Sequence, residues 1–77
     1  MQIKILAFGQ VAGVTGNSLM LEESIKDTES LKSILHQRYP ALRDMKYALA
    51  VDKKLVNGNM ELKENVTVAL LPPFSGG

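Results

Sequence analysis

The stretch Val66-Thr67-Val68-Ala69-Leu70-Leu71 is the most continuous apolar run in the chain. A short run of this kind is typical of a strand that is buried in the middle of a sheet. Pro72 and Pro73 follow it and end the strand, because proline cannot donate a hydrogen bond to a sheet ladder. The sequence therefore predicts a central strand over residues 66–71, from which the C-terminal segment leaves the fold directly.

The N-terminal part of the chain shows the period of two that is typical of strands. Residues 3–8 place Ile3, Ile5 and Ala7 on one face, which predicts a first strand. Residues 18–22 alternate again and predict a second strand that forms a hairpin with the first. Glycines punctuate the connection, which is predicted as a loop with one short helical turn around residues 10–12.

The apolar period changes to that of a helix after residue 27. The stripe follows i, i+3, i+4 and i+8, at Leu31, Ile34, Leu35 and Tyr39. Asp27 or Thr28 is expected to cap the start, and Pro40 forces the helix to end just after Tyr39. Because only one side of this helix is apolar, we expect it to cover one face of a sheet.

The rest of the chain completes an α+β pattern. An irregular turn is expected over 41–45, a third strand over 47–51 and a minor extended piece at 55–56, and Leu62 is expected in the core. This order predicts a ubiquitin-like β-grasp, a mixed sheet of four to five strands with one main helix packed across one face. We expect a single β-grasp domain over 1–71 and a flexible C-terminal tail over 72–77.

Composition disfavours several classes of function. The net charge is +1, aromatic residues make up 5% and tryptophan is absent, so neither nucleic acid nor an anionic membrane is an expected partner. No apolar stretch is long enough to span a bilayer, and the N-terminus lacks a signal-peptide pattern. The lack of cysteine removes disulfides and thiolate metal sites and fits a reducing compartment. We therefore expect a cytoplasmic protein.

The chain carries no recognisable catalytic machinery of its own. The glycines at 9, 13 and 16 do not match a nucleotide-binding pattern, and His36 has no second histidine or cysteine with which to bind a metal ion. Ser75 has no base nearby in sequence, and the paired carboxylates at 22–23 and 27–29 are typical of a surface or a helix cap. We expect no cofactor-binding and no metal-binding residues.

The tail itself is the strongest functional signal. Its last two residues, Gly76 and Gly77, lack a Cβ and could enter a tunnel too narrow for other side chains. Two terminal glycines arise by chance in about 0.5% of chains, so their context decides whether they matter. If extended, residues 72–77 reach roughly 18–20 Å, which suits burial of the α-carboxylate of Gly77 inside another protein.

That context resembles one family closely. Residues 66–77 are similar to the C-terminus of the small, sulfur-carrying subunit of molybdopterin synthase, which ends in Pro-Pro-x-Ser/Thr-Gly-Gly. The similarity extends over the whole chain, through the strand ending in Phe8, the helix over 28–40 and the segment 62–65. The departures are Asp52 where relatives often have asparagine, Asn65 where they usually have glycine, and Phe74 where they often have valine.

The resemblance implies a role in molybdenum cofactor biosynthesis. An adenylyltransferase related to ubiquitin-activating enzymes would use ATP to adenylate Gly77, and a sulfur donor protein would convert it to a thiocarboxylate. The tail would then insert into the large synthase subunit, in a heterotetramer, where catalytic residues of that subunit use the sulfur to build molybdopterin from a cyclic pterin phosphate. Gly77 would react, Gly76 and Ser75 would line the channel, and Pro72, Pro73 and Phe74 would form its entrance.

Three alternatives remain open at this point. The chain could be a sulfur carrier of another pathway, such as thiamine synthesis, although the Pro-Pro-x-Ser segment argues against this. It could be a ubiquitin-like modifier that is joined to lysines, or an interaction domain whose terminal glycines are incidental. In the implied carrier role, the sheet face beside the tail would dock against each partner in turn.

Overall fold

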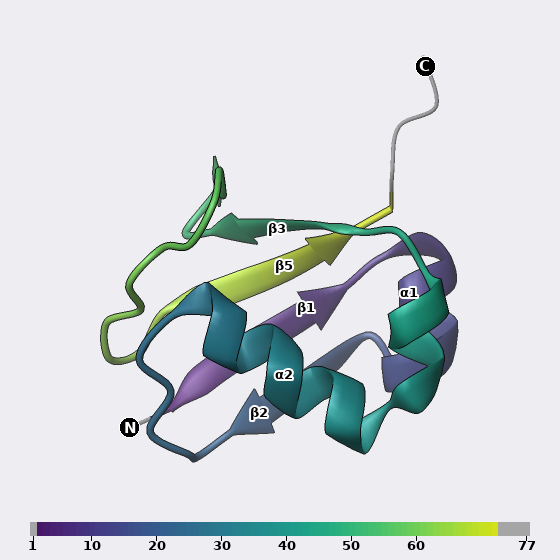
Figure 1. Ribbon diagram of the computed structural model, residues 1–77, viewed down its shortest axis with the longest axis horizontal. Coiled ribbons are helices and arrows are strands. Elements are labelled where there is room, and N and C mark those ends of the chain that lie inside the picture. Colours follow the sequence, from purple (N-terminus) through teal and green to yellow (C-terminus); the bar gives the residue numbers. More distant parts are fainter. Residues whose placement is uncertain (1, 73–77) are drawn as a thin grey trace.

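The computed structural model describes residues 2–72, and the site predictions for Pro73, Phe74, Ser75, Gly76 and Gly77 lie outside this range. The elements are β1 (Ile3–Ala7), α1 (Gly9–Thr15), β2 (Ser18–Leu21), α2 (Thr28–Arg38), the 3-10 helix η1 (Pro40–Asp44), β3 (Ala48–Val51), β4 (Lys54–Leu55) and β5 (Thr67–Leu71). They form one mixed sheet with α2 across one face, as Figure 1 shows. The predicted β-grasp architecture is confirmed.

The last strand occupies the centre of the sheet. The strand order is β2-β1-β5-β3-β4, with β5 parallel to β1 and antiparallel to β3. The predicted hairpin of β1 and β2 is antiparallel, and β3 and β4 form a second antiparallel pair. In Figure 1, β5 runs between β3 and β1 toward the end of the sheet where β1 also ends. The predicted central position of the last strand is confirmed, and β5 is the strand that joins the two pairs.

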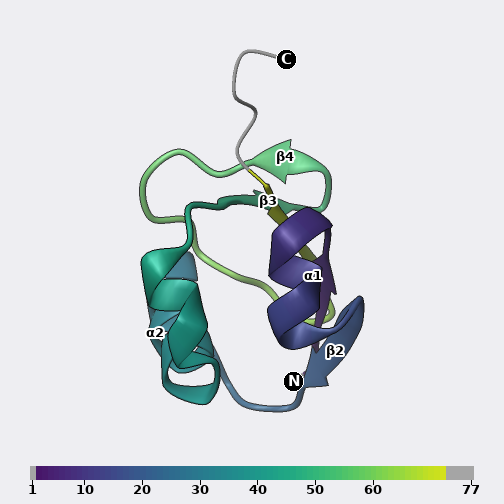
Figure 2. The same ribbon diagram turned by 90° about the vertical axis from the view of Figure 1, so that its right-hand side faces the viewer.

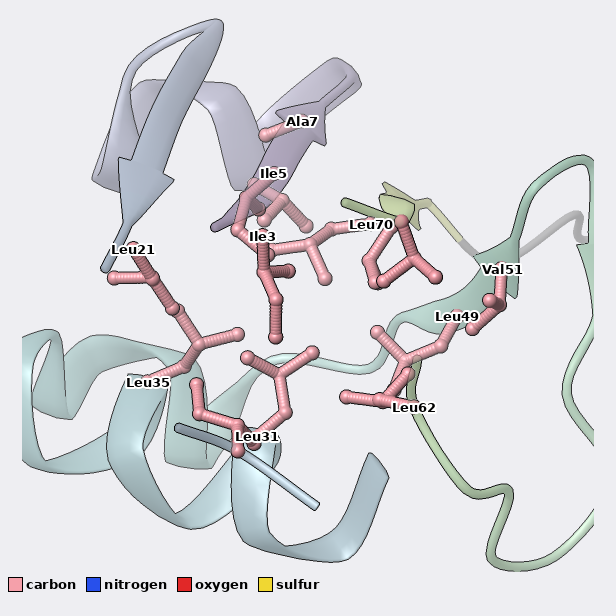
Figure 3. Packing of buried hydrophobic residues seen from close by; sticks show 14 of the residues in the cluster. Ile3, Ile5, Ala7, Leu21, Leu31, Leu35, Leu49, Val51, Leu62 and Leu70 are labelled. Carbon is pink, nitrogen blue, oxygen red and sulfur yellow. The ribbon is translucent and has the colours of Figure 1, made fainter. Parts of the chain in front are cut away.

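The core lies between α2 and the sheet. Leu31 and Leu35 of α2 are fully buried and point toward Ile3 of β1, as Figure 3 shows. Leu62, which was expected in the core, is also buried. The helix begins as predicted, because the Asp27 carboxylate accepts a hydrogen bond from the Ser30 backbone N–H at 2.9 Å. This bond is the main reason why the pKa of Asp27 lies below its ordinary value.

The connection between β1 and β2 differs from the prediction. It holds a seven-residue helix, α1, where a loop with one short helical turn was expected. Val11 and Thr15 lie one turn apart and are both buried, so packing against the sheet compensates for the low helix propensity of two glycines. In Figure 2, α1 lies nearest the viewer, at the end of the sheet where β1 and β5 end.

Element boundaries differ from the predictions by a residue or two, as is usual at frayed ends. The helix α2 ends at Arg38, and the turn expected over 41–45 is the 3-10 helix η1. The minor extended piece is β4 at Lys54–Leu55, one residue earlier than expected.

The environment of His36 was also not predicted. His36 lies in the last turn of α2 and is half-buried, and its Nε2 lies 2.6 Å from the Tyr47 hydroxyl oxygen. The two rings meet edge to face, with centroids 6.0 Å apart. This pair joins α2 to the segment that leads into β3.

Candidate functional site

The tail begins at the end of the central strand, where β1 also ends. Of the predicted site residues, Pro72 is the one that the structure describes. The Phe8 backbone N–H donates to the Leu70 carbonyl oxygen at 3.2 Å. This bond continues the β1–β5 pairing to the end of β5, just before the tail. The ring of Pro72 then packs against Gly9, and a Cβ added to Gly9 would lie 3.1 Å from Pro72 Cγ. The starting point of the tail is therefore fixed by two neighbouring strands.

The sheet face opposite α2 carries an apolar surface beside this point. Strand register aligns Leu6, Ala69, Ala50 and Leu55 in one row across four strands. We define the open sheet face as this row together with the two apolar residues near the tail, which gives Leu6, Phe8, Ala50, Leu55, Ala69 and Leu71. These side chains line a shallow hollow of about 650 Å³.

Exposure makes this face a candidate docking surface. The side chain of Leu55 is 70% exposed and that of Phe8 is 47% exposed, at opposite sides of the hollow. Single exposed apolar residues are ordinary, but a contiguous apolar patch with a polar rim is typical of a protein interaction site. Asp52 and Lys53 form part of the rim. Such a face could hold a partner while the neighbouring tail enters it.

The turn between β3 and β4 determines where Leu55 lies. Asp52 and Lys53 have φ values of 47° and 73°, in the left-handed region used by two-residue hairpin turns. Aspartate tolerates this conformation better than most residues do, whereas lysine adopts it less often than aspartate. The same conformation recurs at Asn65, with φ 61°, and asparagine also tolerates it better than most residues.

Residues 2–72 contain no cluster of three His, Asp or Glu side chains that could hold a metal ion. Over the same residues, no helix combines the length and the apolar character needed to cross a membrane.

Comparison with known proteins places the chain in a family. The model of the ThiS family matches residues 5–77. The chain belongs to this family. It is 33% identical over 84 residues to the molybdopterin synthase sulfur carrier subunit of Caenorhabditis briggsae, a match that covers 97% of this chain and 96% of that protein. The resemblance inferred from the sequence is thereby confirmed.

Solved structures agree with the fold. A complex of subunits 1 and 2 of the molybdopterin-converting factor from Helicobacter pylori 26695 contains a chain that matches with a TM-score of 0.74 and 26% identity, over the whole of both chains. A putative subunit 1 of molybdopterin converting factor from Pyrococcus furiosus matches with a TM-score of 0.85 at 17% identity, over 96% of this chain and 99% of that one. The second match concerns the fold alone.

The sequence predicted a docking face beside the tail, but it did not indicate which residues form this face. The signal was present in β1 and the residue after it, where Leu6 and Phe8 alternate with the buried Ile5 and Ala7. Two large apolar residues on the face that does not pack against α2 indicate an uncovered surface. Gly9 was counted as a loop glycine, and its contact with Pro72 could not be predicted, because it joins residues far apart in sequence.

Proposed function

We propose that this chain is the sulfur-carrier subunit of a molybdopterin synthase. The observation that supports this most directly is the position of the diglycine segment, which follows a central strand that ends beside an exposed apolar face. Membership of the ThiS family and the 33% identical sulfur carrier subunit support the same role. The fold supplies a rigid base and a docking surface, and the C-terminal carboxylate supplies the chemistry.

The proposed chemistry takes place at Gly77. A carboxylate resists nucleophilic attack because it is negatively charged, so it must first be activated. An oxygen of the Gly77 carboxylate attacks the α-phosphorus of ATP on an activating enzyme, and pyrophosphate leaves. Hydrosulfide supplied by a donor protein then attacks the acyl carbon, AMP leaves and the S–H proton is released, which gives the thiocarboxylate without any change of oxidation state. ATP is consumed by the activating enzyme and is not a cofactor of this chain.

The tail that carries the thiocarboxylate then delivers its sulfur to a second partner. In this proposal Gly76 and Ser75 line the channel of the large synthase subunit, and Pro72, Pro73 and Phe74 lie at its entrance. The large subunit supplies the catalytic residues that transfer sulfur to a cyclic pterin phosphate. The Helicobacter pylori complex of subunits 1 and 2 supports a partner of this kind. We propose a heterotetramer in the cytoplasm.

The open sheet face fits the docking step. Leu71 and Phe8 lie at the base of the tail, so a partner that covers them also receives the tail. Covering apolar surface stabilises a complex by about 25 cal/mol per Å², before the costs of association. Because the activating enzyme and the large subunit must both take the same terminus, we propose that they use this face in turn.

Intact mass spectrometry tests the carrier function. The chain is produced together with its activating enzyme and sulfur donor, and its mass is compared with that of the chain produced alone. We expect one oxygen to be replaced by sulfur, and no such change in a matched variant that lacks Gly77. A mass that stays that of the plain carboxylate under sulfur-replete conditions contradicts the carrier function.

A complementation experiment separates the pathways. A strain without its molybdopterin carrier and a strain without its thiamine carrier each receive the full chain. We expect recovery of molybdenum-enzyme activity and no recovery of thiamine synthesis. The opposite result keeps the carrier chemistry but assigns it to the other pathway.

A further inference from the structure

Gly9 and Pro72 form a contact that no step of the sulfur cycle yet explains. Gly9 begins α1 directly after β1, and its φ of 61° lies in the region that glycine adopts without strain. Pro72 is the first residue after β5. A Cβ on Gly9 would lie 3.1 Å from Pro72 Cγ and 3.2 Å from Pro72 Cβ. The absence of a side chain at Gly9 therefore lets the proline ring lie this close to the backbone.

The contact restricts the direction of the tail at its base. Carbon atoms prefer separations of about 3.5–4.0 Å, so an alanine at position 9 would have to push the ring away or shift α1. The backbone N–H of Phe8 already bonds to the Leu70 carbonyl oxygen, which holds both chain segments close together. With the backbone held there, the ring of Pro72 is the part that a Cβ at position 9 would displace, by a few tenths of an ångström.

A small shift at Pro72 has a large effect at the reacting end. If residues 73–77 are extended inside a partner, they reach roughly 16 Å from Pro72. A change of direction at the base is multiplied over this length, and a misplacement of about 1 Å at a reacting atom can cost as much as 100-fold in rate.

We propose that Gly9 is a positioning residue for the C-terminal tail. By leaving room for the Pro72 ring, it sets the direction in which the tail leaves the sheet toward a partner docked on the open sheet face. This inference rests on the proposed carrier function, and it adds a residue 68 positions away from the reacting glycine.

Gly16 provides the matched control. Its φ of 87° is also positive, so alanine is strained there as well, but nothing lies within 4 Å of a Cβ added to it. Gly9→Ala and Gly16→Ala therefore both put alanine at positive φ, and they differ in the contact with Pro72. With ψ 168°, Gly16 lies in a region almost confined to glycine, so the backbone strain of G16A is at least that of G9A. Gly16 ends α1 and has no part in the proposed docking or transfer.

The experiment measures adenylation of the full-length chain by pyrophosphate exchange with its activating enzyme. We expect G9A to lower kcat/KM about tenfold relative to G16A, although its melting temperature should be no lower than that of G16A. Pro72→Ala removes the ring, so G9A should change kcat/KM by less than about twofold in the P72A background. A purely structural role of Gly9 predicts the same loss with and without the ring. Nuclear Overhauser contacts between Gly9 Hα and the Pro72 ring protons report the contact itself.

The outcomes separate this inference from the function on which it rests. Equal activity of G9A and G16A, with an active wild type, overturns the positioning role and leaves the carrier function standing. The positioning role is also overturned if G9A lowers kcat/KM as much in the P72A background as in the wild type. Absence of the Overhauser contacts between Gly9 and the Pro72 ring overturns it as well. A wild-type chain that is never adenylated overturns the carrier function and this inference together.

Discussion

Asp52 and Thr67 exchange two hydrogen bonds across the end of the β3–β5 pair. The Asp52 backbone N–H donates to the Thr67 carbonyl oxygen at 2.8 Å, and the Asp52 carboxylate accepts from the Thr67 backbone N–H at 3.0 Å. The side chain thus continues the ladder where the backbone has already turned away. The two hydrogen bonds hold the turn between β3 and β4 against the central strand β5. The position of Leu55, which follows this turn, depends on them.

Replacement of Asp52 tests this fastening. We expect Asp52→Ala to lower the free energy of unfolding by about 1–2 kcal/mol, because it removes the hydrogen bond to Thr67 and puts alanine at positive φ. Asp52→Asn keeps an acceptor oxygen and a residue that tolerates this conformation, so its effect should stay within about 0.5 kcal/mol. Urea unfolding measures both. Equal destabilisation by the two substitutions would show that the negative charge matters and the acceptor does not.

Leu55 should contribute to binding and hardly to folding. Because its side chain is 70% exposed, Leu55→Ser should change the free energy of unfolding by no more than about 0.5 kcal/mol. If the open sheet face docks on the large synthase subunit, the same substitution should weaken that complex about 30-fold, as expected for a buried anchor residue. Titration calorimetry with the large subunit measures the affinity.

Met20→Ser is the matched control for Leu55. Met20 is 51% exposed and lies on β2, in register with Lys4 and away from the tail. We expect it to leave the affinity for the large subunit unchanged. Equal weakening by both substitutions would argue against a docking site centred on the open sheet face.

Tyr47 should make stability depend on alkaline pH. Burial raises the pKa of Tyr47 above its ordinary value of 10.0, so the folded chain keeps this proton to higher pH than the unfolded chain. The contribution is fully present below pH 10.0 and is lost as pH rises from there through the folded pKa. Urea unfolding between about pH 8 and pH 11 follows this loss.

Tyr47→Phe removes this alkaline component. We expect a flatter pH dependence above pH 10.0 and a uniform loss of about 1 kcal/mol at lower pH, because the hydrogen bond between Tyr47 and His36 is also removed. If wild type and variant show the same alkaline slope, another group is responsible.

Local patterns were sufficient to predict most of the fold. The apolar stripe through Leu31 and Leu35 predicted α2, because its period matches one side of a helix that must be covered. The continuous apolar run before Pro72 predicted β5 as a central strand, because such a run is typical of a strand buried on both faces. In the structure β5 lies between β1 and β3. These features are encoded within a few neighbouring residues.

Features that depend on distant partners were not predictable. The helix α1 contains Gly9 and Gly13, and it forms because Val11 and Thr15 are buried against the sheet and η1. The bond between His36 and Tyr47 and the packing of Pro72 on Gly9 likewise join separate elements. In the site, the diglycine segment indicated the chemistry, whereas the full set of docking residues became evident from the strand register and the hollow beside the tail.

The central position of β5 has a consequence for how the protein is made. The pairs β1–β2 and β3–β4 are held in one sheet by β5, which follows all the other described strands in chain order. A nascent or truncated chain without residues 67–71 therefore leaves two separate hairpins that cannot close around a common core. Synthesis of β5 therefore completes the sheet and provides the base of the tail in the same step.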